Sequence, residues 1–235
     1  RRQLIESMGK AVEWYHQRLL EGADARAARD YLRQRGLAGD VARTFKLGWA
    51  PDDWDAMSRN MGVAFEMLRD TGLAFTNKAG RVQDSFRARI LFPIYTENGD
   101  PVAFGGRILP SSSDPAKYKN SSETAIYAKS KTLYGLNWAK ADIVAADQVI
   151  VCEGYTDVIG FHRAGIKRAV ATCGTALTED HVRLPVAEKS PDPAPPPAPS
   201  SWPDSLREQL AATRPTAAKL PSGVKRWITA GTKRS

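Results

Sequence analysis

The sequence predicts an α+β protein in which a basic part, made of helices and a mixed sheet, precedes a smaller α/β part. Apolar residues recur at helical spacing through much of residues 1–73. Residues 86–109 instead favour two strands joined by a turn, and residues 148–175 contain a short apolar strand, a helix and a second strand. The apolar residues change from helical spacing to strand-like runs along the chain, and this change predicts the order of the two parts.

The first region predicts two packed helices over residues 1–20 and 25–35 and a further helical segment over 54–73. Most of its aromatic residues fall on helical apolar faces. Packing in the core is therefore expected for the following four: Trp14, Tyr15, Trp49 and Trp54.

The two predicted strands, residues 86–95 and 102–109, flank the turn Glu97–Asp100 and should pair as a hairpin. Gly105 and Gly106 interrupt the second strand. Paired glycines inside a strand indicate a bulge or a close approach of another group to the backbone.

The β-α-β segment predicts a site at the carboxyl end of its first strand, Val149–Cys152, where ligands collect in such sheets. Glu153 follows this strand, Gly154 allows a turn, Thr156 can cap the next helix, and Asp157 lies in its first turn. Two carboxylates four residues apart can face Mg²⁺. An acid in a first helical turn also complements the helix dipole, so a structural role for Asp157 stays open.

The net charge of +8 favours an acidic partner such as nucleic acid. No run of eighteen apolar residues and no leader occurs, so a soluble, cytoplasmic protein without a membrane partner is expected. Cys152, Cys173 and three histidines do not form a zinc-binding pattern, so zinc is not expected.

Seven cations follow one another through the predicted sheet region: Arg87, Arg89, Arg107, Lys117, Lys119, Lys129 and Lys131. Surface cations are often merely solvated, but these arginines alternate with apolar strand residues. Tyr118 and Asn120 beside Lys117 add a stacking group and a hydrogen-bonding group. The combination predicts a track for a single-stranded nucleic acid.

The composition changes near Pro185, since ten of the fifteen prolines lie between Pro185 and Pro221. This segment favours an extended linker, and the basic end of the chain favours a solvated tail.

The middle of the chain closely resembles the RNA-polymerase domain of DnaG-type bacterial DNA primases. Five motifs in the family's order carry the resemblance: Arg87–Ile94, Phe104–Arg107, Lys117–Ser121, Leu133–Leu136 and Glu153–Val158. The last motif resembles the opening of a Toprim fold. The resemblance covers roughly residues 1–184 and implies three parts: a template-binding subdomain (1–140), a partial Toprim subdomain (141–184) and a proline-rich disordered tail (185–235).

The resemblance implies synthesis of short RNA primers on a single-stranded DNA template from ribonucleoside triphosphates, with Mg²⁺ as the cofactor. It implies a basic ridge for template and primer from Arg87, Arg89, Arg107, Lys117, Tyr118 and Lys129, beside which Asn120 is a further candidate. Glu153 would be the metal-site carboxylate, with Asp157 close by. A replicative helicase partners the full-length family through a domain that is not expected here.

Two family features are not found in the sequence. A zinc module should precede the domain, and a third Toprim strand ending in Asp-x-Asp should follow residue 184, where Pro185 begins the proline-rich stretch. We hypothesise an incomplete metal site, weak or absent primer synthesis and an uncovered edge at Val149–Cys152. Two alternatives stay open: a catalytically silent single-strand-binding fragment, and another Toprim enzyme such as a nuclease or topoisomerase.

Overall fold

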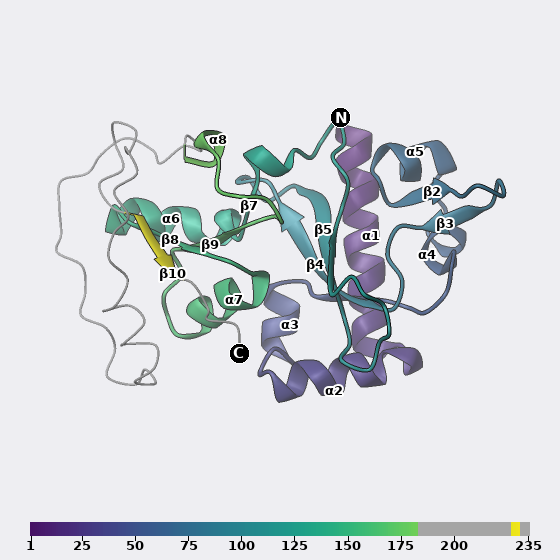
Figure 1. Cartoon of the computed structure of the whole chain (residues 1–235), viewed down its shortest axis with the longest axis horizontal. Helices are drawn as coiled ribbons and strands as arrows, with labels where there is room; N and C mark the ends of the chain where they lie inside the picture. Colours follow the sequence, from purple (N-terminus) through teal and green to yellow (C-terminus); the bar gives the residue numbers. More distant parts are fainter. Residues whose placement is uncertain (183–226, 231–235) are drawn as a thin grey trace. The chain divides into compact units, whose positions relative to one another are not determined.

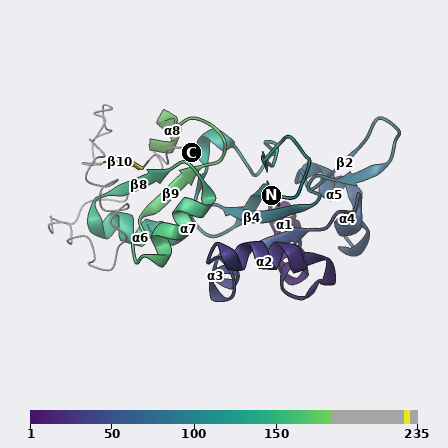
Figure 2. The ribbon, with the colours of Figure 1, turned by 60° about the horizontal axis from the view of Figure 1, so that its bottom comes forward.

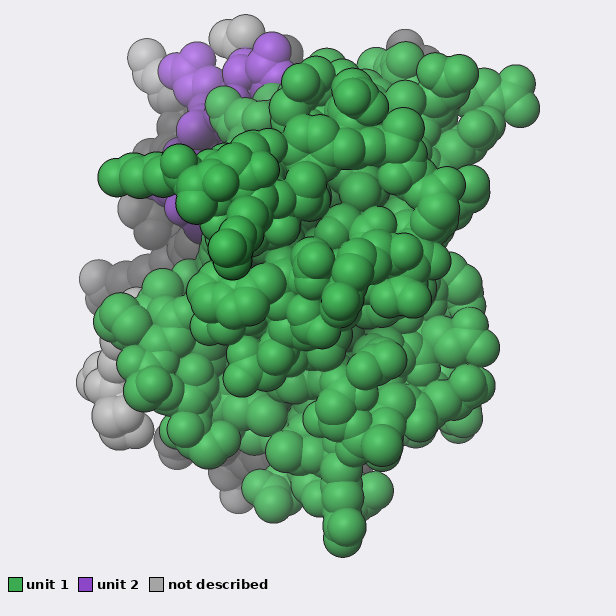
Figure 3. Space-filling model, turned by 90° about the vertical axis from the view of Figure 1, so that its right-hand side faces the viewer, with its two compact units in different colours: residues 1–128 green, residues 129–235 purple. Residues whose placement is uncertain are grey.

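A computed structural model describes residues 1–182 and 227–230 of the chain (Figure 1). It divides into two compact units, residues 1–128 and 129–235, which Figure 3 colours separately. The boundary that the sequence places after residue 140 falls inside a helix of the second unit. The remainder of the expected tail, 185–226 and 231–235, lies outside the described residues.

Unit 1 begins with helices, and the two helices expected over residues 1–20 and 25–35 are confirmed. The helical elements of unit 1 are α1 (Arg2–Glu21), η1 (Ala23–Ala25), α2 (Arg26–Gln34), α3 (Asp40–Thr44), α4 (Ala56–Asn60) and α5 (Phe65–Asp70). The single helical segment expected over 54–73 is wrong, because it is two short helices. Gly62 lies between them with a φ of 61°, which a right-handed helix cannot continue.

The sheet of unit 1 has four antiparallel strands in the order β1-β4-β5-β6. They are β1 (Gly48–Ala50), β4 (Arg89–Tyr95), β5 (Pro101–Ile108) and β6 (Tyr118–Asn120). Figure 2 labels the inner strand β4 of this sheet. The predicted hairpin of β4 and β5 is confirmed. Its turn is closed by the Thr96 N–H, which donates to the Asp100 carbonyl at 2.8 Å.

Helix α1 packs on this sheet and forms the core of unit 1 (Figure 1). The rings of Tyr15 and Phe104 meet edge to face with centroids 5.5 Å apart. Gly48 lets α1 lie close to β1, because a Cβ on residue 48 would lie only 2.7 Å from the Cβ of Tyr15. Burial of each large apolar side chain contributes about 1.5–3 kcal/mol.

Gly105 and Gly106 do not form the bulge that the sequence allowed. Pairing with β4 is continuous there, and the register shifts instead at Ile94 and Tyr95. The alternative, a close approach, is confirmed: a Cβ on Gly106 would lie 2.8 Å from the Phe86 ring. The glycine therefore makes room for a core aromatic ring.

A second, two-stranded sheet, which the sequence analysis missed, is formed by β2 (Ala74–Thr76) and β3 (Val82–Asp84). Asp84 joins this hairpin to α4. Its carboxylate accepts hydrogen bonds from the Met57 N–H at 2.7 Å and the Ser58 N–H at 3.1 Å. It thereby satisfies two of the free amides at the start of α4.

Unit 2 holds a mixed sheet in the order β10-β8-β9-β7. Its strands are β7 (Leu133–Tyr134), β8 (Val149–Cys152), β9 (Ala169–Thr172) and β10 (Trp227–Ala230), and its helical elements are η2 (Lys129–Lys131), α6 (Leu136–Ala146), α7 (Tyr155–Arg163) and α8 (Glu179–Val182). Strands β8 and β9 are parallel and joined through α7, as the sequence predicts. None of the helices in the described part of the chain has the length and hydropathy of a membrane span.

The expected uncovered edge at β8 is wrong. Residues 227–230, which the sequence assigned to a solvated tail, form β10 and pair with β8 in parallel, from Trp227 opposite Val149 to Ala230 opposite Cys152. Both edges of β8 are therefore hydrogen-bonded.

Asp84→Ala should lower the free energy of unfolding by about 1–3 kcal/mol, because two helix amides lose their acceptor. Urea unfolding measures the change. Asp40→Ala is the control, because Asp40 also begins a helix but has a fully exposed side chain and a long ion pair of 3.6 Å. Equal effects for the two variants would contradict the capping role.

Ile228→Pro should expose the edge of β8 and promote aggregation, because proline removes a ladder N–H inside β10. Light scattering on gentle heating measures this, and Ile228→Val, which keeps the N–H, serves as the control. Identical scattering of the proline variant and the unsubstituted chain would contradict the pairing.

Candidate functional site

A groove of about 1060 Å³ crosses unit 1 between the β2–β3 hairpin and the β5–β6 side of the four-stranded sheet. All three exposed aromatic side chains of residues 1–182 line it, with exposed fractions of 55% for Trp54, 43% for Phe75 and 45% for Tyr118. Single exposed apolar side chains are common on proteins, but several gathered in one groove mark a binding site. Their convergence therefore indicates a stacking surface.

The Arg87 guanidinium stacks on the Trp54 ring at one end of this groove. The Arg87 guanidinium carbon lies 3.7 Å from the Trp54 ring centre, and its Nε lies 3.4 Å from an Asp52 carboxylate oxygen. The packing role expected for Trp54 is wrong, because the residue lies in the loop before α4 and not on a helical face. The expectation is confirmed for Tyr15 and Trp49, which are buried.

Arg89 lines the groove, but its donors hold a loop. Its side chain is 4% exposed, Nη1 donates to the Ala116 carbonyl at 2.8 Å, and Nη2 pairs with Asp114 at 2.7 Å. The Ala116 N–H, and then the Arg89 charge, lower the pKa of the Asp114 carboxyl. Arg89 thus fixes the loop that leads to Lys117 and Tyr118.

Arg107 of β5 is buried between two tyrosine rings. Its guanidinium carbon lies 4.8 Å from the ring centre of Tyr31 and 5.7 Å from that of Tyr118, and Arg35 covers Tyr31 at 5.3 Å. Arg107 is 7% exposed, yet within the described residues it forms no ion pair, and its Nε and the Tyr31 hydroxyl lack hydrogen-bond partners. Arg35, Tyr31, Arg107 and Tyr118 thus form one stack, the Arg107 column. Burying a cation without an anion costs free energy, so this column fits an anionic ligand.

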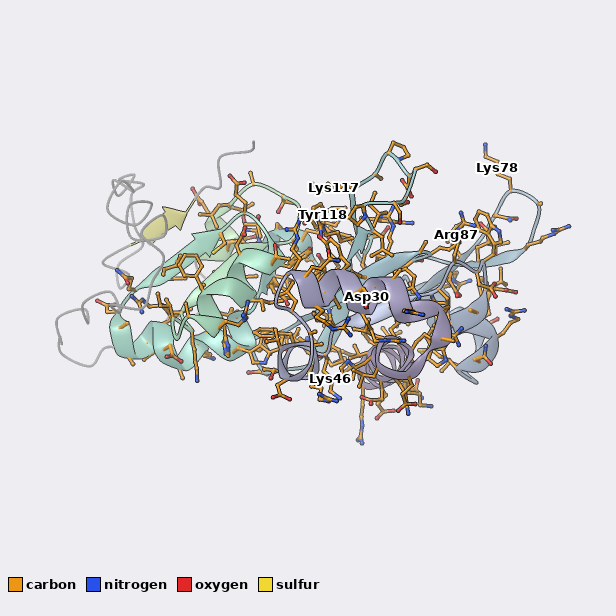
Figure 4. The ribbon with its side chains drawn as sticks, turned by 90° about the horizontal axis from the view of Figure 1, so that it is seen from below. Asp30, Lys46, Lys78, Arg87, Lys117 and Tyr118 are labelled. Carbon is orange, nitrogen blue, oxygen red and sulfur yellow. The ribbon has the colours of Figure 1, made fainter. Side chains whose placement is uncertain are left out.

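Lys117 precedes Tyr118, and Asn120 ends the same edge strand, β6. Figure 4 shows Lys117 and Tyr118 close together, on the same side of the view as Arg87. Asn120 lines a neighbouring cavity of about 300 Å³, to which Lys119 also contributes. Desolvation of the Lys119 ammonium, and then the Arg89 charge, lower its pKa.

The interior of the groove is nearly neutral. Asp52 and Asp114 pair with Arg87 and Arg89, and Asp84 caps α4. Among the described residues, Lys119 lines the groove without an ion pair, and three further cations without ion pairs lie outside its lining: Arg35, Arg107 and Lys117. The groove lining, with its exposed rings and mostly neutralised charges, therefore suits uncharged rings, and the unpaired cations suit phosphates.

Four residues of this surface escaped the sequence analysis: Tyr31, Arg35, Trp54 and Phe75. Tyr31 and Arg35 lie four positions apart around the end of α2, a spacing that places them on one face. Trp54 follows two aspartates in a loop, which separates it from the helical pattern. No sequence signal marks Phe75, because its exposure depends on a hairpin that was not predicted.

Glu153 and Asp157 both lie in unit 2 near the carboxyl end of β8, where the sequence placed them. Glu153 is exposed, and Asp157 lies in the first turn of α7. Burial, and then the charge of Glu153, raise the pKa of the Asp157 carboxyl, although a Gly154 N–H donates to it. The expected cap is wrong, because Gly154 and not Thr156 occupies the N-cap of α7.

These two carboxylates fit part of a magnesium site. Hard oxygen donors suit Mg²⁺, which is often held by one or two carboxylates together with substrate phosphates and water. In residues 1–182 and 227–230, no group of three or more His, Cys, Asp or Glu side chains could hold a metal ion. The two cysteines are buried and unpaired.

Lys129 belongs to unit 2, where partly buried hydrogen bonds hold its backbone. The Thr178 N–H donates to His181 Nδ1 at 3.1 Å, so Nε2 carries the proton and donates to the Lys129 carbonyl at 2.7 Å. The Thr178 hydroxyl donates to the Ser130 carbonyl at 2.8 Å. The turn that carries Lys129 and Lys131 is therefore held in place.

Comparison with known proteins links these features to one family. The model of the DNA primase catalytic core, N-terminal domain, matches residues 14–140, which is more than half of the chain, and a Toprim domain matches residues 147–218. Both matches agree with the order of subdomains that the sequence predicts.

Curated relatives are DNA primases. The chain is 40% identical to that of Streptomyces coelicolor over 184 residues, and 39% identical to that of Escherichia coli K12 over 186 residues. These alignments cover 77% and 78% of the chain but 28% and 32% of the relatives. The chain thus spans less than a third of their length.

Solved structures agree. The RNA polymerase domain of Mycobacterium tuberculosis primase DnaG, in complex with double-stranded DNA carrying a 6-nucleotide overhang, is 38% identical with a TM-score of 0.74, over 78% of this chain and 58% of that one. A DnaG primase catalytic domain bound to ssDNA is 40% identical with a TM-score of 0.71, over 78% and 59%. The chain belongs to the DnaG-type DNA primase family, with the N-terminal domain of the catalytic core followed by Toprim sequence.

Proposed function

We propose that this chain is the part of a DNA primase catalytic core that holds a single-stranded DNA template. The observation that carries the proposal is the groove of unit 1, where exposed rings gather beside a buried arginine without an anion. Each base stacked on an aromatic ring contributes about 1–3 kcal/mol and needs no particular sequence. The binding of ssDNA by a similar catalytic domain supports the same ligand here.

In this proposal Arg107 and Lys117 bind template phosphates while Tyr118 and Trp54 stack on bases. Arg87 orients the Trp54 ring, and Arg89 positions the loop before Lys117. Asn120 and Lys129 are further template or primer contacts. If four cations neutralise phosphates, the log-log slope of affinity against salt is roughly −3.

The reaction of the complete family domain is transfer of a ribonucleotide to a primer 3′-hydroxyl. Mg²⁺, when bound, supplies charge stabilisation at the phosphates and activates the attacking oxygen. Glu153 and Asp157 would hold it. No side-chain nucleophile is needed, and we propose ribonucleoside triphosphates and an RNA primer as partners, with the cytoplasm as the compartment.

We propose that the metal site of this chain is incomplete. Two-metal transfer needs several carboxylates around ions about 4 Å apart, and Glu153 with Asp157 are too few. The lack of a third metal-ligating side chain among the described residues favours the second candidate function, a single-strand-binding piece that synthesises little or no primer alone.

Arg107→Met should weaken binding of a fluorescent single-stranded DNA about tenfold and reduce the salt slope by about 0.7, because one phosphate contact is lost while the apolar stem remains. Fluorescence anisotropy across a salt series measures both. Arg43→Met is the control, since Arg43 is an exposed arginine outside the groove. Unchanged affinity and slope for Arg107→Met would contradict the proposed site.

Labelled ribonucleotide incorporation on single-stranded DNA with Mg²⁺ or Mn²⁺ should be weak or absent, although the same preparation binds the DNA. Glu153→Gln tests the source of any product, because it removes a metal ligand with little change in shape. Robust synthesis that Glu153→Gln abolishes would overturn the incomplete-site proposal and leave the template-binding proposal standing.

A further inference from the structure

The groove has an unequal supply of available cations at its two ends. Arg107 and Lys117 lie at the Tyr118 end without ion pairs among the described residues. At the Trp54 end, Arg87 is stacked on the ring and paired with Asp52. A strand whose bases stack along the whole groove therefore needs other cations for its phosphates at the Trp54 end.

The β2–β3 hairpin supplies such cations. Its strand β2 places Phe75 in the groove wall, and Lys78 follows three residues later, roughly 10 Å away along an extended chain. Lys78 and Arg81 are both exposed. Figure 4 shows Lys78 projecting from the tip of the hairpin, on the same side of the view as Arg87, Lys117 and Tyr118, whereas Lys46 lies on the opposite side.

The tip is preorganised. Asn77 Oδ1 accepts hydrogen bonds from the Ala79 N–H at 2.9 Å and the Arg81 N–H at 3.0 Å, and the Asn77 N–H donates to the Arg81 carbonyl at 2.9 Å. A two-stranded hairpin alone is marginal in water. These bonds hold the two cations on a defined turn, which lowers the entropy lost when they bind a ligand.

The base of the hairpin is also anchored. The Asp84 N–H donates to the Trp54 carbonyl at 2.6 Å, and the Ser85 N–H donates to the Leu73 carbonyl at 2.8 Å. The first bond joins the hairpin directly to the residue that carries the stacking ring. Neither Lys78 nor Arg81 forms an ion pair within the described part of the chain, so both charges are available.

We propose that the β2–β3 hairpin is a second binding element, which holds the phosphate backbone of the single strand as it leaves the groove. Phe75 stacks on the last base in the groove, and Lys78 and Arg81 bind the phosphates beyond it. The proposal rests on the proposed function of the groove. It adds a minimum length of single-stranded DNA for contact with both elements, because a short strand that fills only the Tyr118 end does not reach the hairpin.

The test compares single-stranded oligothymidylates of roughly 6 and roughly 16 nucleotides, within the range of common single-strand sites. Lys78→Ala with Arg81→Ala should weaken the longer strand about fivefold to tenfold and reduce its salt slope by about 1.4, with less than a twofold change for the shorter one. Phe75→Leu should likewise weaken only the longer strand, and Phe75→Trp should retain its affinity.

The matched control is Arg2→Ala with Lys10→Ala, which removes the same charge from exposed positions on α1. An unchanged affinity and salt slope for the longer strand, or a loss equal to that of the control, would overturn the hairpin proposal. Arg107→Met separates the two proposals, because it should weaken both strands. If Arg107→Met changes neither, the groove itself is not the binding site.

Discussion

The placement of Arg107 between the rings of Tyr31 and Tyr118 is the constraint on which the proposed interface depends. The two rings come from a helix and from the edge strand of the sheet, so helix, inner strand and edge must all be in place before the arginine is held. Its charge is largely removed from water and meets no carboxylate in the described residues. Such an arrangement stores an unfavourable electrostatic energy that an incoming phosphate relieves.

Most of the charges in the groove lining are neutralised or already engaged. The acidic residues of the groove pair with Arg87 and Arg89 or cap α4, so the exposed rings dominate its lining. Arg107 and Lys117, which form no ion pairs among the described residues, lie outside that lining. This division matches the chemistry of a single strand, whose bases are uncharged planes and whose backbone is anionic. It also explains why an arginine count along the sequence overstates the number of phosphate contacts. Arg89 donates its hydrogen bonds to the loop at Asp114 and Ala116, and the Arg87 guanidinium stacks on the Trp54 ring.

Sequence analysis recovers the elements whose signals are local. Strand β8, helix α7 and the turn at Glu97–Asp100 follow from the spacing of apolar residues and from turn residues. Glu153 and Asp157 follow from their place at a strand end. The Arg107 column depends on contacts between residues far apart in sequence, which no periodic pattern encodes. The division between α4 and α5 at Gly62 and the exposure of Trp54 were missed for a related reason. There the backbone breaks a helical pattern that the side chains alone would continue.

The pairing of β10 with β8 has a consequence for the order of folding. Unit 1 closes its sheet within the first 128 residues, although β1 and β4 are separated in sequence by the β2–β3 hairpin, whereas β8 acquires its outer neighbour from a segment that begins at Trp227. Contacts between distant segments slow folding, because the intervening chain must be ordered first. During synthesis, unit 1 can therefore reach its native state on the ribosome while β8 still awaits its partner strand.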